Sequence, residues 1–121
     1  MFDHIGLNVR DYERSKAFYE QALAPLGFAK TADFEEWKAC AFGPQGKYGF
    51  WIAQREPYGT GTHVAFTVAD RATVDAFHAA AVAAGGTDNG APGLREHYHS
   101  TYYAAFVLDL DGNNVETVCH T

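Results

Sequence analysis

Two short stretches of the chain alternate apolar and polar residues with a period of two, which is typical of a half-buried β-strand. They cover residues 5–9 and 64–68. Asp11 and Asp70 follow at the position of a helix N-cap, and each precedes a segment whose apolar residues have helical spacing. The pattern therefore predicts a strand followed by a helix, twice.

The two strand–helix segments are similar to each other. One shift along the chain aligns His4 with His63. The same shift aligns Phe18 with Phe77 in the helices that follow. Internal similarity of this kind indicates a duplicated structural unit.

Further strands are expected after each helix. Proline and glycine residues end the helices near 25–27 and 84–86, and apolar stretches separated by turn-forming residues come next. In the second half a loop-rich stretch from Thr87 comes first. The predicted strands cover residues 28–34, 37–42, 48–53, 101–109 and 114–120.

Each half of the chain therefore has the order of a βαβββ module. The first module is expected within residues 1–57 and the second within residues 61–121. Many antiparallel strands with only two helices favour the α+β class over a doubly wound parallel sheet. We expect one domain that covers residues 1–121.

Composition and charge narrow the classes of function. Hydrophobic residues make up 47% of the chain and charged residues 20%, as in an ordinary folded domain. The formal net charge is −6 without a basic cluster, which argues against binding to nucleic acid. Neither a signal peptide nor a membrane-spanning stretch is expected, so the predicted location is cytoplasmic. Cys40 and Cys119 lack CxxC spacing and are expected to be small buried apolar residues.

His4 and His63 lie at matching positions in the two predicted strands. Because successive side chains of a strand face opposite sides, both histidines lie opposite the apolar residues, among small and polar neighbours. Glu116 lies within the last strand, where an unpaired buried carboxylate would be costly. A single strand histidine is more often a hydrogen-bonded filler than a ligand. Together, however, two histidines and one carboxylate are the donors of a facial metal site.

Three longer segments carry a resemblance to a known family. They are DHIGLNVRDYERSKAFYEQALAPLGF at residues 3–28, THVAFTVADRATVDAFHAA at 62–80 and YYAAFVLDLDGNNVETVCH at 102–120. Together they resemble the glyoxalase, bleomycin-resistance and extradiol-dioxygenase group, the vicinal oxygen chelate superfamily. The resemblance implies βαβββ modules paired into an open, cupped mixed sheet.

The same resemblance implies a metal centre and a partner. The ligands would be His4, His63 and Glu116, holding one divalent metal ion, with zinc, nickel, manganese and iron all open. Family likeness also implies a homodimer. Whether each cup forms within one chain or across two is left open by the sequence.

One position departs from the family pattern. The lyase and epimerase branches commonly carry a fourth ligand, Glu or Gln, on the last strand of the first module. Here that position is occupied by Phe50 or Trp51, depending on a one-residue choice of register. Neither side chain can coordinate a metal, which argues against a true lactoylglutathione lyase activity.

Other polar residues are candidates for the site. The segment 95–103 is rich in histidine and tyrosine, and it is either a lid over the site or a tyrosine-rich entry into a strand. As a lid, it would supply a general acid or base from His97, Tyr98 or His99. The candidate substrate-binding residues are Trp51, Arg95, Tyr103, Asn8 and Thr67.

The leading functional hypothesis is a metal-dependent enzyme that acts on a small molecule with vicinal oxygens. A glyoxalase-like lyase or isomerase, a ring-cleaving dioxygenase and a thiol transferase all remain open. The alternative is a metal-free protein that binds and sequesters a small molecule, as bleomycin-resistance proteins do. A structural dimer module with an unused polar triad ranks last.

Overall fold

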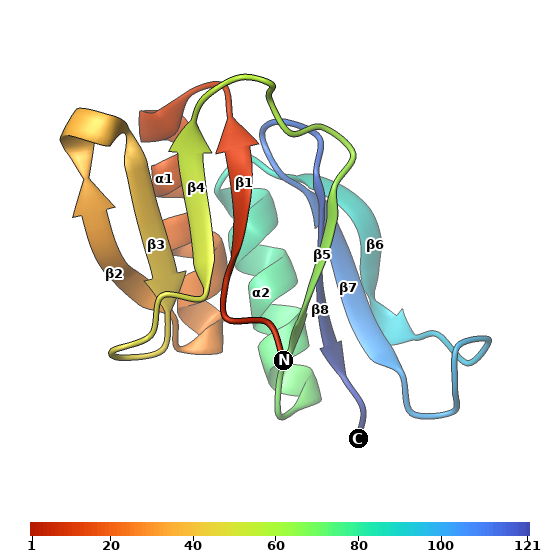
Figure 1. Ribbon diagram of the computed structural model, residues 1–121. Helices are drawn as coiled ribbons and strands as arrows, with labels where there is room; N and C mark the ends of the chain where they lie inside the picture. Colours follow the sequence, from red (N-terminus) through yellow and green to blue (C-terminus); the bar gives the residue numbers. More distant parts are fainter.

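The computed structural model describes residues 1–121 and contains two modules with the same order of elements (Figure 1). The first comprises β1 (Ile5–Val9), α1 (Tyr12–Leu23), the 3-10 turn η1 (Ala24–Leu26), β2 (Ala29–Phe34), the 3-10 turn η2 (Glu35–Trp37), β3 (Ala39–Gly43) and β4 (Phe50–Gln54). The second comprises β5 (His63–Thr67), α2 (Arg71–Ala83), β6 (Thr87–Leu94), β7 (Tyr103–Leu108) and β8 (Asn114–Cys119).

Each module forms one mixed sheet of four strands. The strand orders are β1-β4-β3-β2 and β5-β8-β7-β6. The first strand of each module pairs in parallel with the last, and the other pairs are antiparallel. The α+β class and the duplicated βαβββ order predicted from the sequence are confirmed.

Both helices begin where the sequence predicts. Asp11 accepts a hydrogen bond from the backbone amide of Arg14 at 3.1 Å, and Asp70 accepts one from Thr73 at 2.8 Å. Each carboxylate thereby satisfies an amide that has no partner within its helix. The first helical segment ends at Gly27, whose φ of 80° suits a residue without a side chain.

Strand β6 corrects the expectation of a loop-rich stretch from Thr87. Its composition is poor for a strand, with Gly90, Pro92 and Gly93 among eight residues. The strand lies at the edge of its sheet and pairs only with β7, with shifts of register near both glycines. An edge strand needs only one row of hydrogen bonds, so it tolerates residues that a central strand does not.

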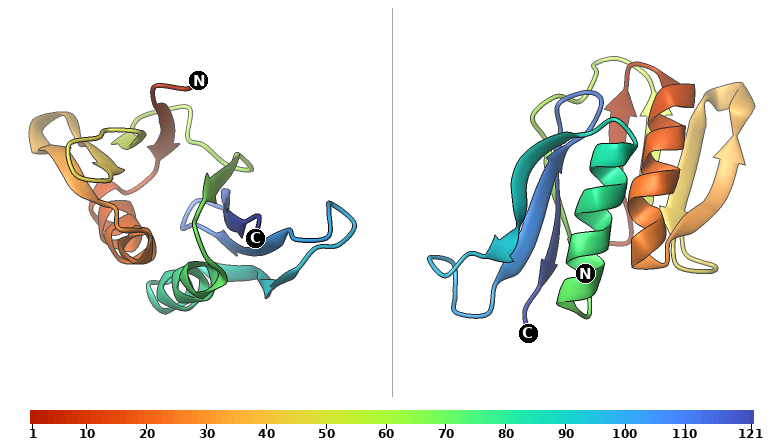
Figure 2. Two further views of the ribbon diagram at one scale, coloured as in Figure 1. Left: turned by 90° about the horizontal axis from the view of Figure 1, so that it is seen from below. Right: turned by 180° about the vertical axis from the view of Figure 1, so that it is seen from behind.

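The two modules share one hydrophobic core. Helices α1 and α2 pack against each other between the sheets (Figure 2). Leu7 of β1 and Val64 of β5 belong to the same buried cluster, and the rings of Phe50 and Phe66 meet edge to face at 5.5 Å. Since both sheets turn their apolar faces toward the helices, their open faces point in different directions.

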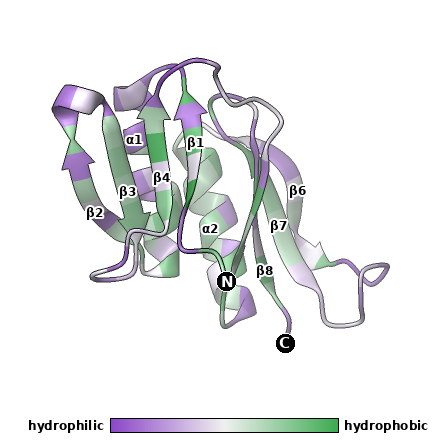
Figure 3. Cartoon of the chain, viewed as in Figure 1, coloured by the Kyte–Doolittle hydropathy of each residue, from purple (hydrophilic) through white to green (hydrophobic).

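The hydropathy of the residues differs between parts of the two sheets (Figure 3). Hydrophobic residues are concentrated on β3 and β4, whereas the connection between β6 and β7 is largely hydrophilic.

Cys40 and Cys119 are both buried and free, which confirms their predicted role as small apolar residues. Neither helix combines the length and the apolar character needed to cross a lipid bilayer.

Candidate functional site

The open face of the second module brings His63 and Glu116 together. His63 begins β5 and lies on the face opposite the buried Val64. Glu116 of the neighbouring β8 pairs with Ala65, two residues further along β5, so both side chains project from the same face. The His63 Nε2 atom is 2.9 Å from Glu116 Oε1.

Glu116 is buried but fully partnered. Its exposed fraction is 2%, whereas the side chain of His63 is 52% exposed. The second carboxylate oxygen accepts a hydrogen bond from the hydroxyl of Tyr102. Burial, reinforced by this hydrogen bond and the nearby carboxylate, raises the pKa of Tyr102 to about 12. The tyrosine therefore stays protonated and donates to Glu116 at neutral pH.

Tyr102 also connects Glu116 to a cluster of rings. Its ring lies 4.8 Å from that of Tyr98, 5.2 Å from that of His99 and 5.4 Å from that of His120. The facing nitrogens of His99 and His120 are 2.8 Å apart. The ring of His97 lies 4.2 Å from that of Tyr98, with 51° between their planes, and both side chains are exposed.

The three predicted acid–base candidates thus lie beside the second module's site, and none of them bonds to His63 or Glu116. Sequence reasoning did not select Tyr102 or His120. The signal available for Tyr102 was the need of a buried Glu116 for a second hydrogen-bond donor.

Arg95 and Tyr103 lie on opposite faces of the second sheet. The guanidinium of Arg95 donates to the backbone oxygens of Ala91 and Gly93, both at 2.8 Å. It lies over Phe106, whose ring is 6.3 Å from that of His63, so Arg95 borders the site. Tyr103 points toward α2 instead, where its hydroxyl donates to Asp75 at 2.6 Å. The structure therefore does not bring Tyr103 to the open face.

His4 lies apart from His63 and Glu116 within the chain. It precedes β1, and its Nδ1 atom is 2.6 Å from a carboxylate oxygen of Asp3. Each histidine lies at the start of its strand. Because β1 and β5 run in opposite directions, the two starts lie at opposite ends of the molecule (Figure 1). Within one chain, no three histidine, cysteine or acidic side chains are arranged to hold a metal ion. The predicted donor set is divided between the two modules.

The strand pairing decides which residue of the first module corresponds to Glu116. Gly6 pairs with Trp51 in the same way that Ala65 pairs with Glu116. Phe50 is 1% exposed and belongs to the core. Trp51 therefore occupies the position at which a fourth ligand would project, and its indole cannot serve as one.

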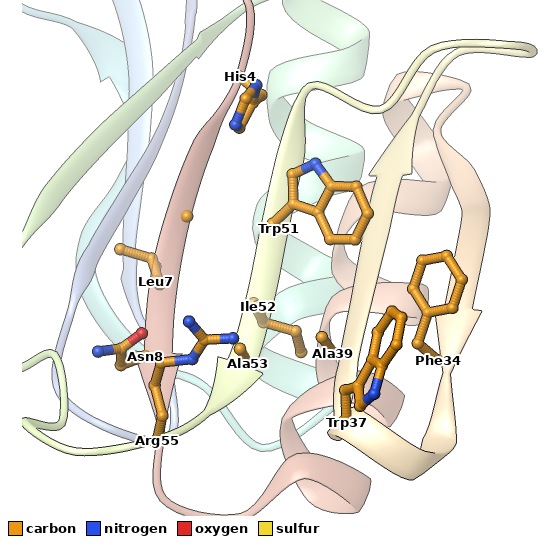
Figure 4. Close-up of a pocket in the computed structure, with 11 residues that line it drawn as sticks. His4, Leu7, Asn8, Phe34, Trp37, Ala39, Trp51, Ile52, Ala53 and Arg55 are labelled. Carbon is orange, nitrogen blue, oxygen red and sulfur yellow. The ribbon is translucent and has the colours of Figure 1, made fainter.

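A pocket of about 520 Å³ lies on the open face of the first module (Figure 4). His4, Asn8 and Trp51 line it, so two predicted substrate-binding residues share a cavity with one predicted ligand. The Asn8 side chain also donates to the backbone oxygen of Pro57 at 2.9 Å. Thr67 is exposed at the end of β5, in the other module.

Comparison with known proteins identifies the family to which the chain belongs. Residues 1–117 match the model of the Glyoxalase/Bleomycin resistance protein/Dioxygenase superfamily. The chain belongs to this superfamily, and the resemblance found in the sequence is confirmed. No curated protein matches the chain.

Solved structures show the same fold. A glyoxalase/bleomycin resistance protein from Albidiferax ferrireducens T118 is 31% identical, with 98% of each chain covered and a TM-score of 0.82. A glyoxalase/bleomycin resistance protein/dioxygenase family enzyme from Burkholderia phytofirmans PsJN is 23% identical, with 98% of each chain covered and a TM-score of 0.72. Glyoxalase I from Zea mays is 20% identical with a TM-score of 0.71, over 97% of this chain and 43% of the maize chain.

Proposed function

We propose that this protein is a metal-dependent enzyme that acts on a small molecule with neighbouring oxygen atoms. Its metal site is completed by two chains: His63 and Glu116 come from one chain and His4 from the partner subunit. The observation that carries the proposal is the convergence of His63 and the buried Glu116 on one open face, 2.9 Å apart. His4 of the same chain lies outside this group, so a second chain supplies the third ligand.

The residues present fit a divalent transition metal. Imidazole and carboxylate are the usual ligands of zinc, nickel, manganese and iron in facial sites. The exposed side of His63 leaves room for substrate oxygens, while the hydrogen bond from Tyr102 orients the Glu116 carboxylate. A bound metal would act as a Lewis acid toward adjacent oxygens of the substrate.

The reaction subclass is narrowed by Trp51. A glyoxalase-like lyase or isomerase, a dioxygenase and a thiol transferase all use adjacent oxygens in this superfamily. Because Trp51 projects where a fourth ligand would stand, the protein supplies three ligands. A strict glyoxalase I reaction, in which the fourth carboxylate moves a proton, is the least favoured of these.

Mixing two inactive variants tests whether the site spans two chains. His4→Ala and Glu116→Ala should each abolish metal binding when purified alone. In a mixed dimer, however, one site combines His4 of the Glu116→Ala chain with His63 and Glu116 of the His4→Ala chain. Mixing after dissociation should therefore restore about a quarter of the wild-type metal content, because half of the dimers are mixed and each has one intact site.

Metal analysis of the mixture gives a direct answer. A mixture that stays metal-free, although mixed dimers are shown to form, would rule out a shared site. Wild-type protein that binds no divalent metal at all would instead favour the metal-free binding protein. Substitution of Asp75 by Asn, on the helix side of the second sheet, is the matched control and should leave metal content unchanged.

A further inference from the structure

We propose that the pocket on the open face of the first module binds the flat aromatic part of an anionic ligand, whose anionic group contacts Arg55. This inference deepens the proposed function by naming a substrate class. It rests on that function only in placing the reacting end of the ligand near His4. The pocket itself is built entirely from residues of the first module and the start of its connector.

The floor of the pocket is flat because small residues form it. Gly6 on β1, Ala53 on β4 and Ala39 on β3 all belong to its lining. Ala39 and Ala53 are direct partners across the two strands. Neighbouring outward positions without bulky side chains leave a level surface on the sheet, against which a flat molecule can lie.

Aromatic rings form one side of the pocket (Figure 4). The rings of Trp51 and Phe34 are nearly parallel, with 2° between their planes and 6.2 Å between their centres. Trp37 lies 5.2 Å from Phe34 and is 66% exposed. A planar aromatic ligand would stack on these rings and remove their apolar surface from water.

The opposite side of the pocket is polar and positively charged. Figure 4 shows Arg55 beside Asn8, across the alanine floor from Trp37 and Phe34. Arg55 has no ion pair, and no acidic residue lines the pocket, although the net charge of the chain is −6. A guanidinium in this position matches a carboxylate, which it can bind with two parallel hydrogen bonds. The volume of about 520 Å³ suits a two-ring compound of this kind.

The two tryptophans allow a direct test. Trp37 and Trp51 are the only tryptophans in the chain, so both indole N–H signals in a ¹H–¹⁵N NMR spectrum report on the pocket. The probe is 2-naphthoate, added to protein kept metal-free with a chelator. Uncharged 2-naphthamide and non-aromatic cyclohexanecarboxylate are the comparison ligands.

We expect 2-naphthoate to shift both indole signals saturably and to bind at least about tenfold more tightly than either comparison ligand, because a charge-assisted hydrogen bond and ring stacking both contribute. Arg55→Gln should remove the preference for naphthoate over naphthamide and leave naphthamide binding unchanged. Trp37→Ala should weaken both aromatic ligands. Arg14→Gln, which changes an exposed arginine on α1, is the matched control and should bind as wild type.

Two results would overturn the proposal: indole signals that do not respond to 2-naphthoate, or an undiminished preference for the anion in Arg55→Gln. Both variants change exposed side chains, and the dispersion of the amide spectrum verifies their fold. The absence of metal separates this test from the proposed metal site. A failure here leaves the mixed-dimer result untouched, and the converse also holds.

Discussion

The side chains around Glu116, the proposed metal ligand, decide how its carboxylate is held. A carboxylate with 2% exposure would be costly to bury alone, yet His63 and Tyr102 each engage one of its oxygens. The exposed His63 contacts one oxygen of the carboxylate, and the hydroxyl of Tyr102 donates a hydrogen bond to the other. The period of two along the strands was enough to place His63 on the open face, whereas Tyr102 comes from a connection whose path no local pattern describes.

Removing the hydroxyl of Tyr102 tests its role as a positioning residue. Tyr102→Phe should weaken divalent-metal binding by roughly tenfold to a hundredfold, since partners of metal ligands typically contribute that much. Calorimetric titration with zinc measures the change. Tyr98→Phe, which alters a neighbouring ring without a hydroxyl hydrogen bond, should bind zinc as wild type. Equal zinc affinities for wild type, Tyr102→Phe and Tyr98→Phe would show that the Tyr102 hydroxyl does not position Glu116 for metal binding.

At the scale of elements, a charged cluster fastens β2 to α1. Asp33 accepts a hydrogen bond from the hydroxyl of Tyr12 at 2.5 Å and forms ion pairs with Lys30 at 2.9 Å and Lys16 at 3.3 Å. These partners, Tyr12 first, hold the pKa of Asp33 at about 2, below its ordinary value of 3.8. A carboxylate with a lowered pKa stabilises the fold at neutral pH, and the stabilisation disappears as acid protonates it.

The contribution of Asp33 should therefore depend on pH in a defined window. Asp33→Asn should lower the free energy of unfolding by about 2 kcal/mol at neutral pH. The difference from wild type should shrink as the pH falls from 3.8 to about 2. Urea unfolding at several pH values measures it. Glu36→Gln, on the adjacent turn, should have little effect. A deficit that persists unchanged at about pH 2 would assign the loss to packing instead of charge.

For the molecule as a whole, one buried contact joins the two modules outside the hydrophobic core. The Tyr19 hydroxyl of α1 donates to Asp109, which lies between β7 and β8. Tyr19 is 0% exposed and Asp109 is 5% exposed. Asp109 also accepts bonds from the side chain and backbone of Asn113, so it organises the turn as well as the contact.

Loss of this contact should destabilise the protein without changing its surface. Tyr19→Phe leaves one carboxylate oxygen of Asp109 short of a donor and should cost about 1–3 kcal/mol of unfolding free energy. Chemical denaturation measures this loss. Tyr48→Phe, which removes an exposed hydroxyl without a hydrogen bond, should be close to neutral. A Tyr19→Phe protein as stable as wild type would show that the remaining donors, from Asn113 and the backbone amide of Asp111, satisfy Asp109.

The local sequence pattern predicted correctly those features that depend only on neighbouring residues. Alternation placed the open and buried faces of β1 and β5, and Asp11 and Asp70 marked the helix starts. Strand β6 escaped prediction because its glycines and proline are acceptable only at an edge, and edge position is a property of the whole sheet. The correspondence of Trp51 to Glu116 likewise depends on strand pairing. A shift of one residue in the register would place Phe50 at that position instead.

By itself the sequence determined the duplicated βαβββ order, the superfamily and the face on which His4 and His63 project. These follow from side-chain periodicity and from similarity between the two halves. Only the tertiary structure decided that His63 and Glu116 meet while His4 lies apart. The physical reason is the shared core: both sheets bury their apolar faces against α1 and α2, so their open faces point in different directions. The spacing of residues along the chain carries no information about the angle between the two sheets.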